Sequence, residues 1–274
     1  MNVENYFINA MSHRSSHIGD DGAIVGEWIY SKDIFFENVH FKRKWLSAYQ
    51  IGYKAMIINI SDAIAMNAQP LYALVGVAMP KSMSLFAMDE LARGMRECAF
   101  QFGIEIIGGD TIANSKLDLS ITIISKSKNP LLRKGLKYGD VIAHTGQIGE
   151  SLRYLRYLMA GGKVNTKSRF VRPVLRNSFI SKARPFLRCG MDLSDGLYSD
   201  IGKLCAANRC GITWKKRYLK QTACSGEEYE MLVAFSARNA KVLERISKLT
   251  RTPLTIVATA RRGKFVNRCK AHHF

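Results

Sequence analysis

The chain has 274 residues and a formal net charge of +19, and 47% of its residues are hydrophobic. This content excludes a largely disordered protein, and the length allows two cores of roughly 100–150 residues each. Residues 1–14 lack the apolar core of a signal peptide, and the longest apolar stretch, residues 71–79, is too short to span a bilayer. We therefore expect a soluble, cytoplasmic protein with no membrane partner.

The positive charge is concentrated in the second half of the chain. Residues 1–130 carry 12 basic and 13 acidic side chains, which leaves 29 basic and 9 acidic side chains for residues 131–274. Such a balance favours an anionic partner: nucleic acid, an anionic surface or a phosphorylated small molecule. A solvated basic surface without a specific partner would also explain it.

In the first half, apolar and β-branched runs alternate with segments of helical periodicity. Strands are expected at residues 27–31, 72–79, 105–107 and 117–125, and helices at residues 46–66 and 83–102. In the second of these helices, apolar residues recur at spacings of three and four, which is typical of a face packed on a sheet. Turn formers at residues 126–130 indicate a linker.

The second half opens with an expected strand at residues 141–144, followed by a turn and helix within residues 146–160 and another helix at residues 197–207. These elements predict a protein of the α/β (α+β) class with domains at residues 1–129 and 130–274. The six cysteines, at positions 98, 189, 205, 210, 224 and 269, form no Cys-x-x-Cys pair. We therefore expect reduced, structural thiols and no cysteine zinc site.

Short acidic motifs, each with Asp beside Gly or Ser, are spread over most of the chain. They contain seven of the eleven aspartates: Asp20, Asp21, Asp33, Asp62, Asp110, Asp192 and Asp195. Carboxylates gathered in one cleft repel one another unless a cation lies between them, and hard oxygen ligands suit Mg²⁺, which usually bridges to phosphate. The motifs therefore predict a magnesium and nucleotide site.

Two of the motifs carry more information than a common turn. Gly108-Gly109-Asp110-Thr111 follows an expected strand, and strand ends are where ligand-binding loops concentrate. In Asp192-Leu193-Ser194-Asp195-Gly196, two carboxylates precede an expected helix whose first N–H groups would face a phosphate. An Asp or Ser N-cap would explain one of these residues but not all three. The chain has neither a P-loop nor a Gly-x-Gly-x-x-Gly fingerprint.

Taken in order, these motifs resemble those of the thiamine-monophosphate kinases, in the superfamily of aminoimidazole ribonucleotide synthetase and selenophosphate synthetase. The matching segments are residues 19–21, Asp33 with residues 39–41, residues 59–68 with Pro70, and residues 108–111, 191–197 and 225–232. The resemblance implies transfer of the γ-phosphoryl group of ATP to thiamine monophosphate, giving thiamine diphosphate and ADP, with several Mg²⁺ ions. It also implies a two-domain fold: an N-terminal mixed sheet that pairs with its twofold mate into a barrel, hence a homodimer, and a C-terminal α/β domain that completes the cleft.

The same resemblance implies roles for individual residues. The metal-binding positions are Asp21, Ser31, Lys32, Asp33, Asp62, Asp110, Asp192 and Asp195, with Lys32 contributing through its backbone carbonyl. The ATP-binding positions are Gly109, Asp110, Arg133 and Ser194, and the substrate-binding positions are His40 and Glu228, the latter where the family usually has Asp. Catalysis is expected to depend on Asp110, Asp195 and Arg133.

Three other interpretations remain. A different ATP-dependent enzyme of the superfamily would use another acceptor, although residues 1–19 contain no Lys or Cys of the kind expected for selenophosphate synthesis. A nucleic-acid-binding protein would explain the basic half through Lys215-Lys216-Arg217-Tyr218, but would leave the aspartate motifs unexplained. A non-catalytic relative is the third, because the segment between Ala207 and Ser225 is shorter than usual in the family. We therefore expect ATP and thiamine monophosphate as partners, and no nucleic acid.

Overall fold

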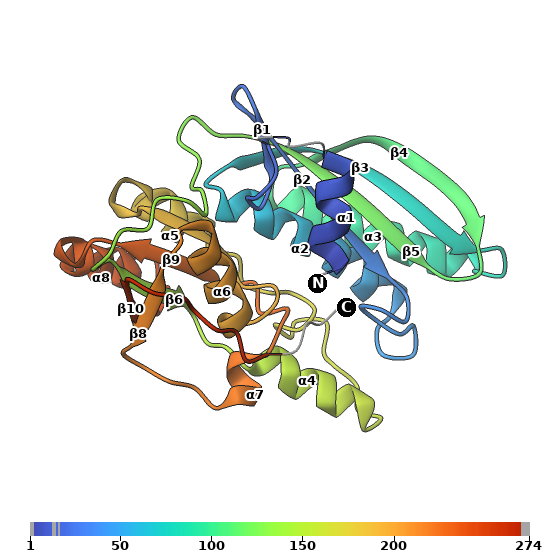
Figure 1. Ribbon diagram of the computed structural model, residues 1–274. Helices are drawn as coiled ribbons and strands as arrows, with labels where there is room; N and C mark the ends of the chain where they lie inside the picture. Colours follow the sequence, from blue (N-terminus) through green and yellow to red (C-terminus); the bar gives the residue numbers. More distant parts are fainter. Residues whose placement is uncertain (1–2, 13–14, 16, 270–274) are drawn as a thin grey trace.

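The computed structural model describes residues 3–12, 15 and 17–269. Within them the chain forms two five-stranded sheets with helices packed against each, one sheet from each half of the sequence (Figure 1). The expected α/β (α+β) class is confirmed. None of the helices in the described part of the chain is long and apolar enough to cross a membrane.

The first sheet has the strand order β1-β2-β5-β3-β4, in which only β3 and β4 pair in parallel. A short helix, α1 (Val3–Ser12), precedes its strands: β1 (Ala23–Val25), β2 (Trp28–Phe36), β3 (Gln69–Pro80), β4 (Glu105–Asn114) and β5 (Asp118–Lys126). Side chains alternate along β2. Ser31 and Phe35 are buried on one face, whereas Lys32 and Ile34 are exposed on the other.

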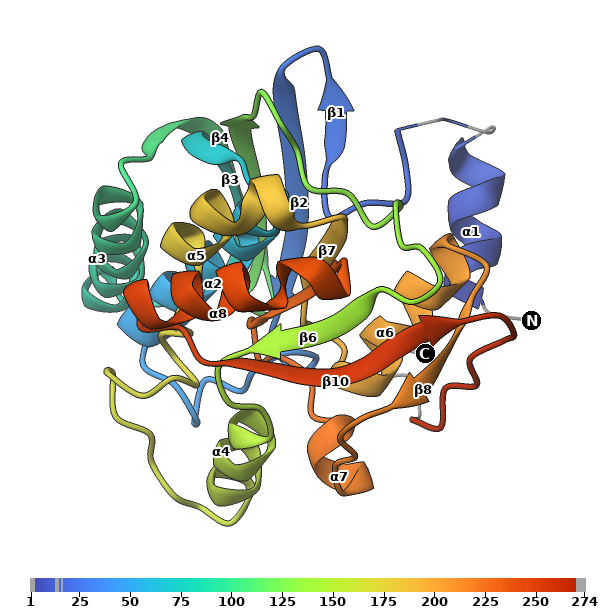
Figure 2. The same cartoon turned by 90° about the vertical axis from the view of Figure 1, so that its left-hand side faces the viewer.

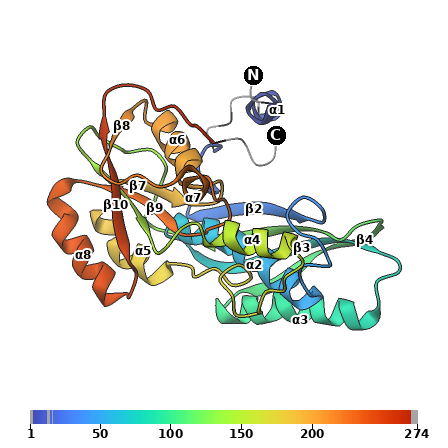
Figure 3. The same cartoon turned by 90° about the horizontal axis from the view of Figure 1, so that it is seen from below.

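Helices α2 (Ala48–Ala65) and α3 (Leu85–Gln101) lie on the same side of this sheet (Figure 3). A capping box begins α2: the Ser47 hydroxyl accepts from the Gln50 N–H, and the Gln50 side chain accepts from the Ser47 N–H. Almost every residue of α2 is buried, because the helix contacts the first sheet, α3 and elements of the second half. The polar residues near its C-terminal end are therefore held inside the molecule.

Strand β4 corrects one expectation. The strand expected to end at residue 107 continues to Asn114, so the Gly108 to Thr111 motif lies within an edge strand and not in a loop after it. Gly109 has a φ of +153°, and a Cβ at this position would overlap the carbonyl of Val75 on β3. Glycine is therefore what allows the two strands to pair here. All ten residues of β4 are exposed.

The second sheet is antiparallel throughout and has the strand order β7-β9-β6-β10-β8. Its strands are β6 (Val141–Thr145), β7 (Cys189–Asp192), β8 (Gly211–Trp214), β9 (Met231–Phe235) and β10 (Leu254–Arg261). The other elements of this half are α4 (Glu150–Met159), α5 (Asn177–Ala183), η1 (Arg184–Phe186), α6 (Leu197–Ala207), α7 (Lys220–Ala223), η2 (Ala237–Asn239) and α8 (Ala240–Leu249). Helices α5 and α8 cover one face of the sheet and α6 covers the other (Figure 2).

The apolar core of the first sheet is not confined to the first half of the chain. Leu158 of α4, Phe170, Val171, Leu175 and Tyr229 all join it. The segment after α4 thus runs back across the first half of the molecule and holds the two halves together through buried apolar contacts.

A disulfide joins Cys224, just after α7, to Cys269, with 5.6 Å between the Cα atoms. The expectation of reduced thiols is therefore wrong for these two residues. They are 45 residues apart in sequence, so only the fold brings them together. A search for Cys-x-x-Cys pairs detects only cysteines close in sequence and therefore could not find this bond. The other four cysteines are free and buried.

Candidate active site

Aspartates from distant parts of the sequence meet where α2 contacts β7. Asp21 lies in the loop before β1, Asp62 in the last turn of α2 and Asp192 at the end of β7. Oxygens of these three carboxylates all lie within 4.8 Å of one another. The Ser61 hydroxyl donates to Asp192 Oδ2 at 2.8 Å. We call these three aspartates the acidic cluster.

Two further predicted aspartates lie beside the acidic cluster. Asp33 extends from the helix-covered face of β2, where its backbone N–H donates to Asn59 Oδ1 of α2 at 2.7 Å. Asp195 lies in the turn between β7 and α6 and is close enough to Asp33 to raise its pKa. Ser31, on the same face of β2, is buried and donates to the Asn59 carbonyl at 3.4 Å. The structure thus gathers most of the predicted metal positions.

Burial and mutual repulsion make protons bind tightly to these carboxylates. Burial is the largest cause that raises the pKa of Asp33, to about 6, and the negative charges of Asp21 and Asp195 raise it further. Burial also raises the pKa of Asp62 and of Asp192, again with neighbouring carboxylates adding to the effect. A cation placed among these groups would remove both penalties.

Two cationic side chains partly neutralise the site. The Arg133 guanidinium pairs with Asp21 Oδ1. The backbone N–H of Arg133 donates to Asp20 Oδ1 at 2.7 Å. Lys203 of α6 pairs with Asp195 and, at 3.1 Å, with Asp200. Neither Lys203 nor Asp200 was among the predicted site residues, although their spacing of three on the helix after Asp195 is a readable signal.

The donor set fits a divalent cation. Asp21 Oδ2 is buried and has no hydrogen-bond partner among the described residues, which is costly unless something else contacts it. It stands with two other carboxylates that offer oxygen atoms, the ligands that Mg²⁺ and Ca²⁺ prefer. Asp21, Asp62 and Asp192 could therefore hold such an ion.

A pocket of about 320 Å³ opens beside the acidic cluster. Its lining includes Ser194, which stands between Asp192 and Asp195 in the sequence, and His40, whose Nδ1 accepts from the Phe36 N–H at 3.0 Å. The remaining lining residues are Val39, Trp45, Ser151, Leu152, Leu155, Met159, Phe170, Cys224, Ser225, Gly226 and Glu227. The pocket is mostly apolar with a few polar groups, as small-molecule sites usually are.

Glu228 is not among the residues that line this pocket. Its Oε1 accepts from the N–H groups of Gly149 and Ser151 at the start of α4 and from the Ser225 hydroxyl. Glu227, one residue earlier, lines the pocket instead. The carboxylate of Glu228 thus holds the N-terminus of α4 in place, and burial raises its pKa.

Lys54 is a buried cation that was not among the predicted site residues. It extends from α2, is 1% exposed, and its Nζ lies 2.7 Å from Glu227 Oε2 and 3.7 Å from the centroid of the Phe170 ring. A lysine inside a helix that is mostly apolar is a visible signal, because such a charge is almost never buried without a partner.

Removing this cation should destabilise the protein. Lys54→Met leaves the Glu227 carboxylate without its partner, so we expect the free energy of unfolding to fall by about 2–3 kcal/mol, measured by urea denaturation. Lys81→Met, at an exposed position, is the matched control and should change it by less than about 0.5 kcal/mol. Equal effects of the two substitutions would show that the buried pair is not stabilising.

Asp110 and Lys32 are not part of the acidic cluster within one chain. Asp110 lies on β4, which is three strand positions away from β2 in the sheet. It pairs in register with Gly76 of β3 and lies on the face opposite to the one that carries Asp33. Three strand spacings correspond to about 14 Å. The side chain of Lys32 also points to that opposite face and donates to Ser120 at 2.7 Å.

The sequence matches known proteins over most of its length. Residues 19–126 match the family described as AIR synthase related protein, N-terminal domain. The chain is 30% identical over 255 residues to the thiamine-monophosphate kinase of Buchnera aphidicola subsp. Schizaphis graminum, covering 82% of this chain and 78% of that protein. The chain belongs to the thiamine-monophosphate kinase family. It is also 29% identical over 279 residues to the Bacillus subtilis member, covering 89% of this chain and 85% of that protein.

Solved structures share the fold. The structure described as AaThiL complexed with AMPPCP and TMP has a TM-score of 0.85 at 22% identity, covering 96% of this chain and 91% of that one. The HypE–HypF complex has a TM-score of 0.79 at 17% identity, covering 95% of this chain and 93% of that one. The resemblance read from the sequence, and the expectation of an enzyme of this kinase family, are confirmed.

Proposed function

We propose that this protein transfers the γ-phosphoryl group of ATP to thiamine monophosphate in a Mg²⁺-dependent reaction, giving thiamine diphosphate and ADP. The observation that carries the proposal is the acidic cluster beside a mostly apolar pocket. Ser194, which lies between Asp192 and Asp195 in the sequence, lines this pocket. Anionic phosphates need cations at the cluster, whereas the thiamine rings need apolar surface. A structural relative complexed with AMPPCP and TMP supports this choice of ligands.

The residues present suit a reaction that needs alignment and charge neutralisation. The attacking phosphate oxygen is ionised at neutral pH, so no strong general base is required. Asp21, Asp62 and Asp192, with Asp33 and Asp195 beside them, would hold Mg²⁺, which supplies charge neutralisation for the phosphates. The guanidinium of Arg133 is held at the cluster and would contact the nucleotide from there.

We further propose that a second copy of the chain completes the site. Strand β4 is an exposed edge strand, and Ile106, Ile107 and Ile112 on it are exposed apolar residues. Pairing of this sheet with that of a second copy would cover them and remove the open edge. It would also allow Gly109 and Asp110 of one copy to serve the nucleotide site of the other.

Binding of Mg²⁺ should release protons from the acidic cluster. Folding raises the pKa of Asp33 from its unfolded value near 4 to about 6, so this group stabilises the metal-free protein below about pH 4, and that stability is lost as the pH rises through 6. We expect calorimetric titrations near pH 6, in two buffers of different ionisation enthalpy, to show net proton release. Mg²⁺ should also raise the Tm more at pH 7.5 than at pH 5. Binding without proton release would contradict the proposed ligands.

The acceptor is tested by the rate of ADP formation with thiamine monophosphate, thiamine or selenide at saturating ATP and Mg²⁺. Of the three acceptors, we expect only thiamine monophosphate to be turned over. The pocket would bind its rings, and Mg²⁺ held by the acidic cluster would neutralise its phosphate. Turnover with selenide, or with none of the three, would favour another enzyme of the superfamily or a non-catalytic relative.

A further inference from the structure

The second half of the chain carries a groove that the proposed reaction does not use. It has a volume of about 530 Å³ and shares no lining residue with the pocket beside the acidic cluster. Its walls come from α6, β8, the segment after β8, and the chain from the end of β10 onward. The lining residues are Tyr198, Ile212, Thr213, Trp214, Arg217, Arg261, Lys264, Phe265, Val266 and Arg268.

The groove is positively charged without compensation. Four of its lining side chains are cationic and none is acidic. Within the described part of the chain, none of the four forms an ion pair with a carboxylate. Arg261 is held instead by backbone carbonyls: its Nε donates to Ile212 at 3.0 Å and its Nη1 to Arg262 at 2.8 Å. Such a surface attracts an anion and repels the cationic thiazolium ring of thiamine.

Aromatic rings line the same groove as these cations. The Trp214 ring centroid is 4.9 Å from that of Tyr198 and 6.1 Å from that of Phe265, and all three side chains are only partly buried. Partly exposed aromatic rings beside Arg and Lys side chains are the combination that binds bases and phosphates together. The ligand chemistry indicated is therefore a flat ring that carries phosphate.

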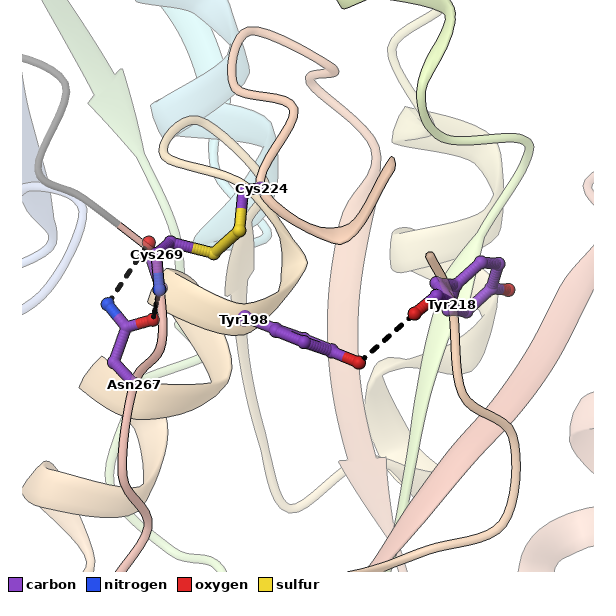
Figure 4. Close-up of a disulfide and its surroundings, with 6 residues drawn as sticks. Tyr198, Tyr218, Cys224, Asn267 and Cys269 are labelled. Carbon is purple, nitrogen blue, oxygen red and sulfur yellow. Dashed lines mark hydrogen bonds between the residues drawn. A yellow bond between two sulfur atoms is a disulfide. The ribbon is translucent and has the colours of Figure 1, made fainter. Parts of the chain in front are cut away.

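One disulfide and two hydrogen bonds hold the chain segments that form the walls of the groove. The disulfide between Cys224 and Cys269 anchors the chain that carries Lys264, Phe265 and Arg268, and Asn267 accepts from the Cys269 N–H at 2.9 Å (Figure 4). On the other side, the Tyr198 hydroxyl donates to the Tyr218 carbonyl at 3.4 Å, which ties α6 to the basic run 215–218 (Figure 4). The segments that form the groove are thus held in place by the rest of the fold.

We infer that this groove binds a nucleotide, with phosphate on Arg217, Lys264 and Arg268 and the base against Trp214. The ligand is either a free nucleotide or a nucleotide within a single strand, since both offer the same phosphate and base. The inference gives a role to part of the basic second half, which the acidic cluster leaves unexplained. It is independent of the proposed kinase reaction.

The test is fluorescence anisotropy of a labelled deoxythymidine pentanucleotide, with AMP as competitor. EDTA is included so that Mg²⁺-dependent binding does not contribute, and reductant is omitted to keep the disulfide. We expect Arg217→Gln with Lys264→Gln to weaken binding about tenfold or more, since each lost charged contact to phosphate is costly. Arg238→Gln with Lys241→Gln, at exposed positions by α8, removes the same charge and should weaken binding less than about twofold.

The outcomes separate the two sources of ligand. Full displacement by AMP supports a free nucleotide, and binding of the pentanucleotide that AMP does not displace supports a strand. Equal weakening by the two double variants would mean attraction by net charge alone and would overturn the inference. Absence of binding by both the pentanucleotide and AMP would overturn it as well.

Discussion

Asp192→Asn should lower the kcat for thiamine diphosphate formation by about 100-fold or more, because a misplaced metal costs several kcal/mol of transition-state stabilisation. The same substitution should raise the Tm of the protein in EDTA. Asp192 is buried among other carboxylates, and its neutral replacement removes repulsion while still accepting the hydrogen bond from Ser61. Loss of activity with gain of metal-free stability separates a metal ligand from a residue needed only for folding.

Steady-state kinetics and thermal unfolding with and without Mg²⁺ measure both effects. Asp89→Asn, at an exposed position on α3, is the matched control and should change neither kcat nor Tm appreciably. Near-normal turnover of Asp192→Asn at saturating Mg²⁺ would remove this residue from the proposed metal site. A lowered Tm in EDTA would show that the carboxylate stabilises the fold.

Two inactive variants should restore activity when combined in one dimer. We expect Asp110→Asn to lower kcat by about 100-fold, as Asp192→Asn does. If Asp110 serves the site of the second copy, a mixed dimer of the two variants has one site with both residues intact. Random mixing makes about half of the dimers mixed, so about a quarter of the wild-type activity should return in the unseparated mixture, and about half in the isolated mixed dimers.

The control for this experiment uses two lesions within one acidic cluster. A mixture of Asp62→Asn and Asp192→Asn has no intact site in any dimer, because both residues lie in the same cluster of the same chain. Mixed dimers are isolated with two different affinity tags after unfolding and refolding together. Mixed Asp110 and Asp192 dimers without recovered activity would show that Asp110 does not act across the interface.

The local signals in the sequence predicted the parts of the fold that depend on periodicity. The helices at residues 46–66 and 197–207 formed at these positions within two residues, because a buried apolar helix and an amphipathic one both have patterns that can be read locally. The strand before Gly108 was predicted too short. Glycines usually end strands, but here they permit a close pairing with β3 that depends on tertiary structure.

Contacts between residues far apart in sequence were harder to predict than the identity of the residues involved. The aspartates of the acidic cluster were found from their motifs, yet nothing local indicated that Asp110 would lie on the opposite face of the sheet. The disulfide between Cys224 and Cys269, and the pairing of Lys54 with Glu227, join residues far apart in sequence. The role of Glu228 was assigned by resemblance, whereas its contacts with the start of α4 appear only in the folded chain.

The most direct test of the proposed reaction is chromatographic separation of the products formed from ATP, Mg²⁺ and thiamine monophosphate. We expect thiamine diphosphate and ADP in equal amounts, none of either above background with EDTA, and at least about 100-fold less of both with Asp192→Asn. ADP without thiamine diphosphate, or thiamine diphosphate formed equally well in EDTA, would contradict it.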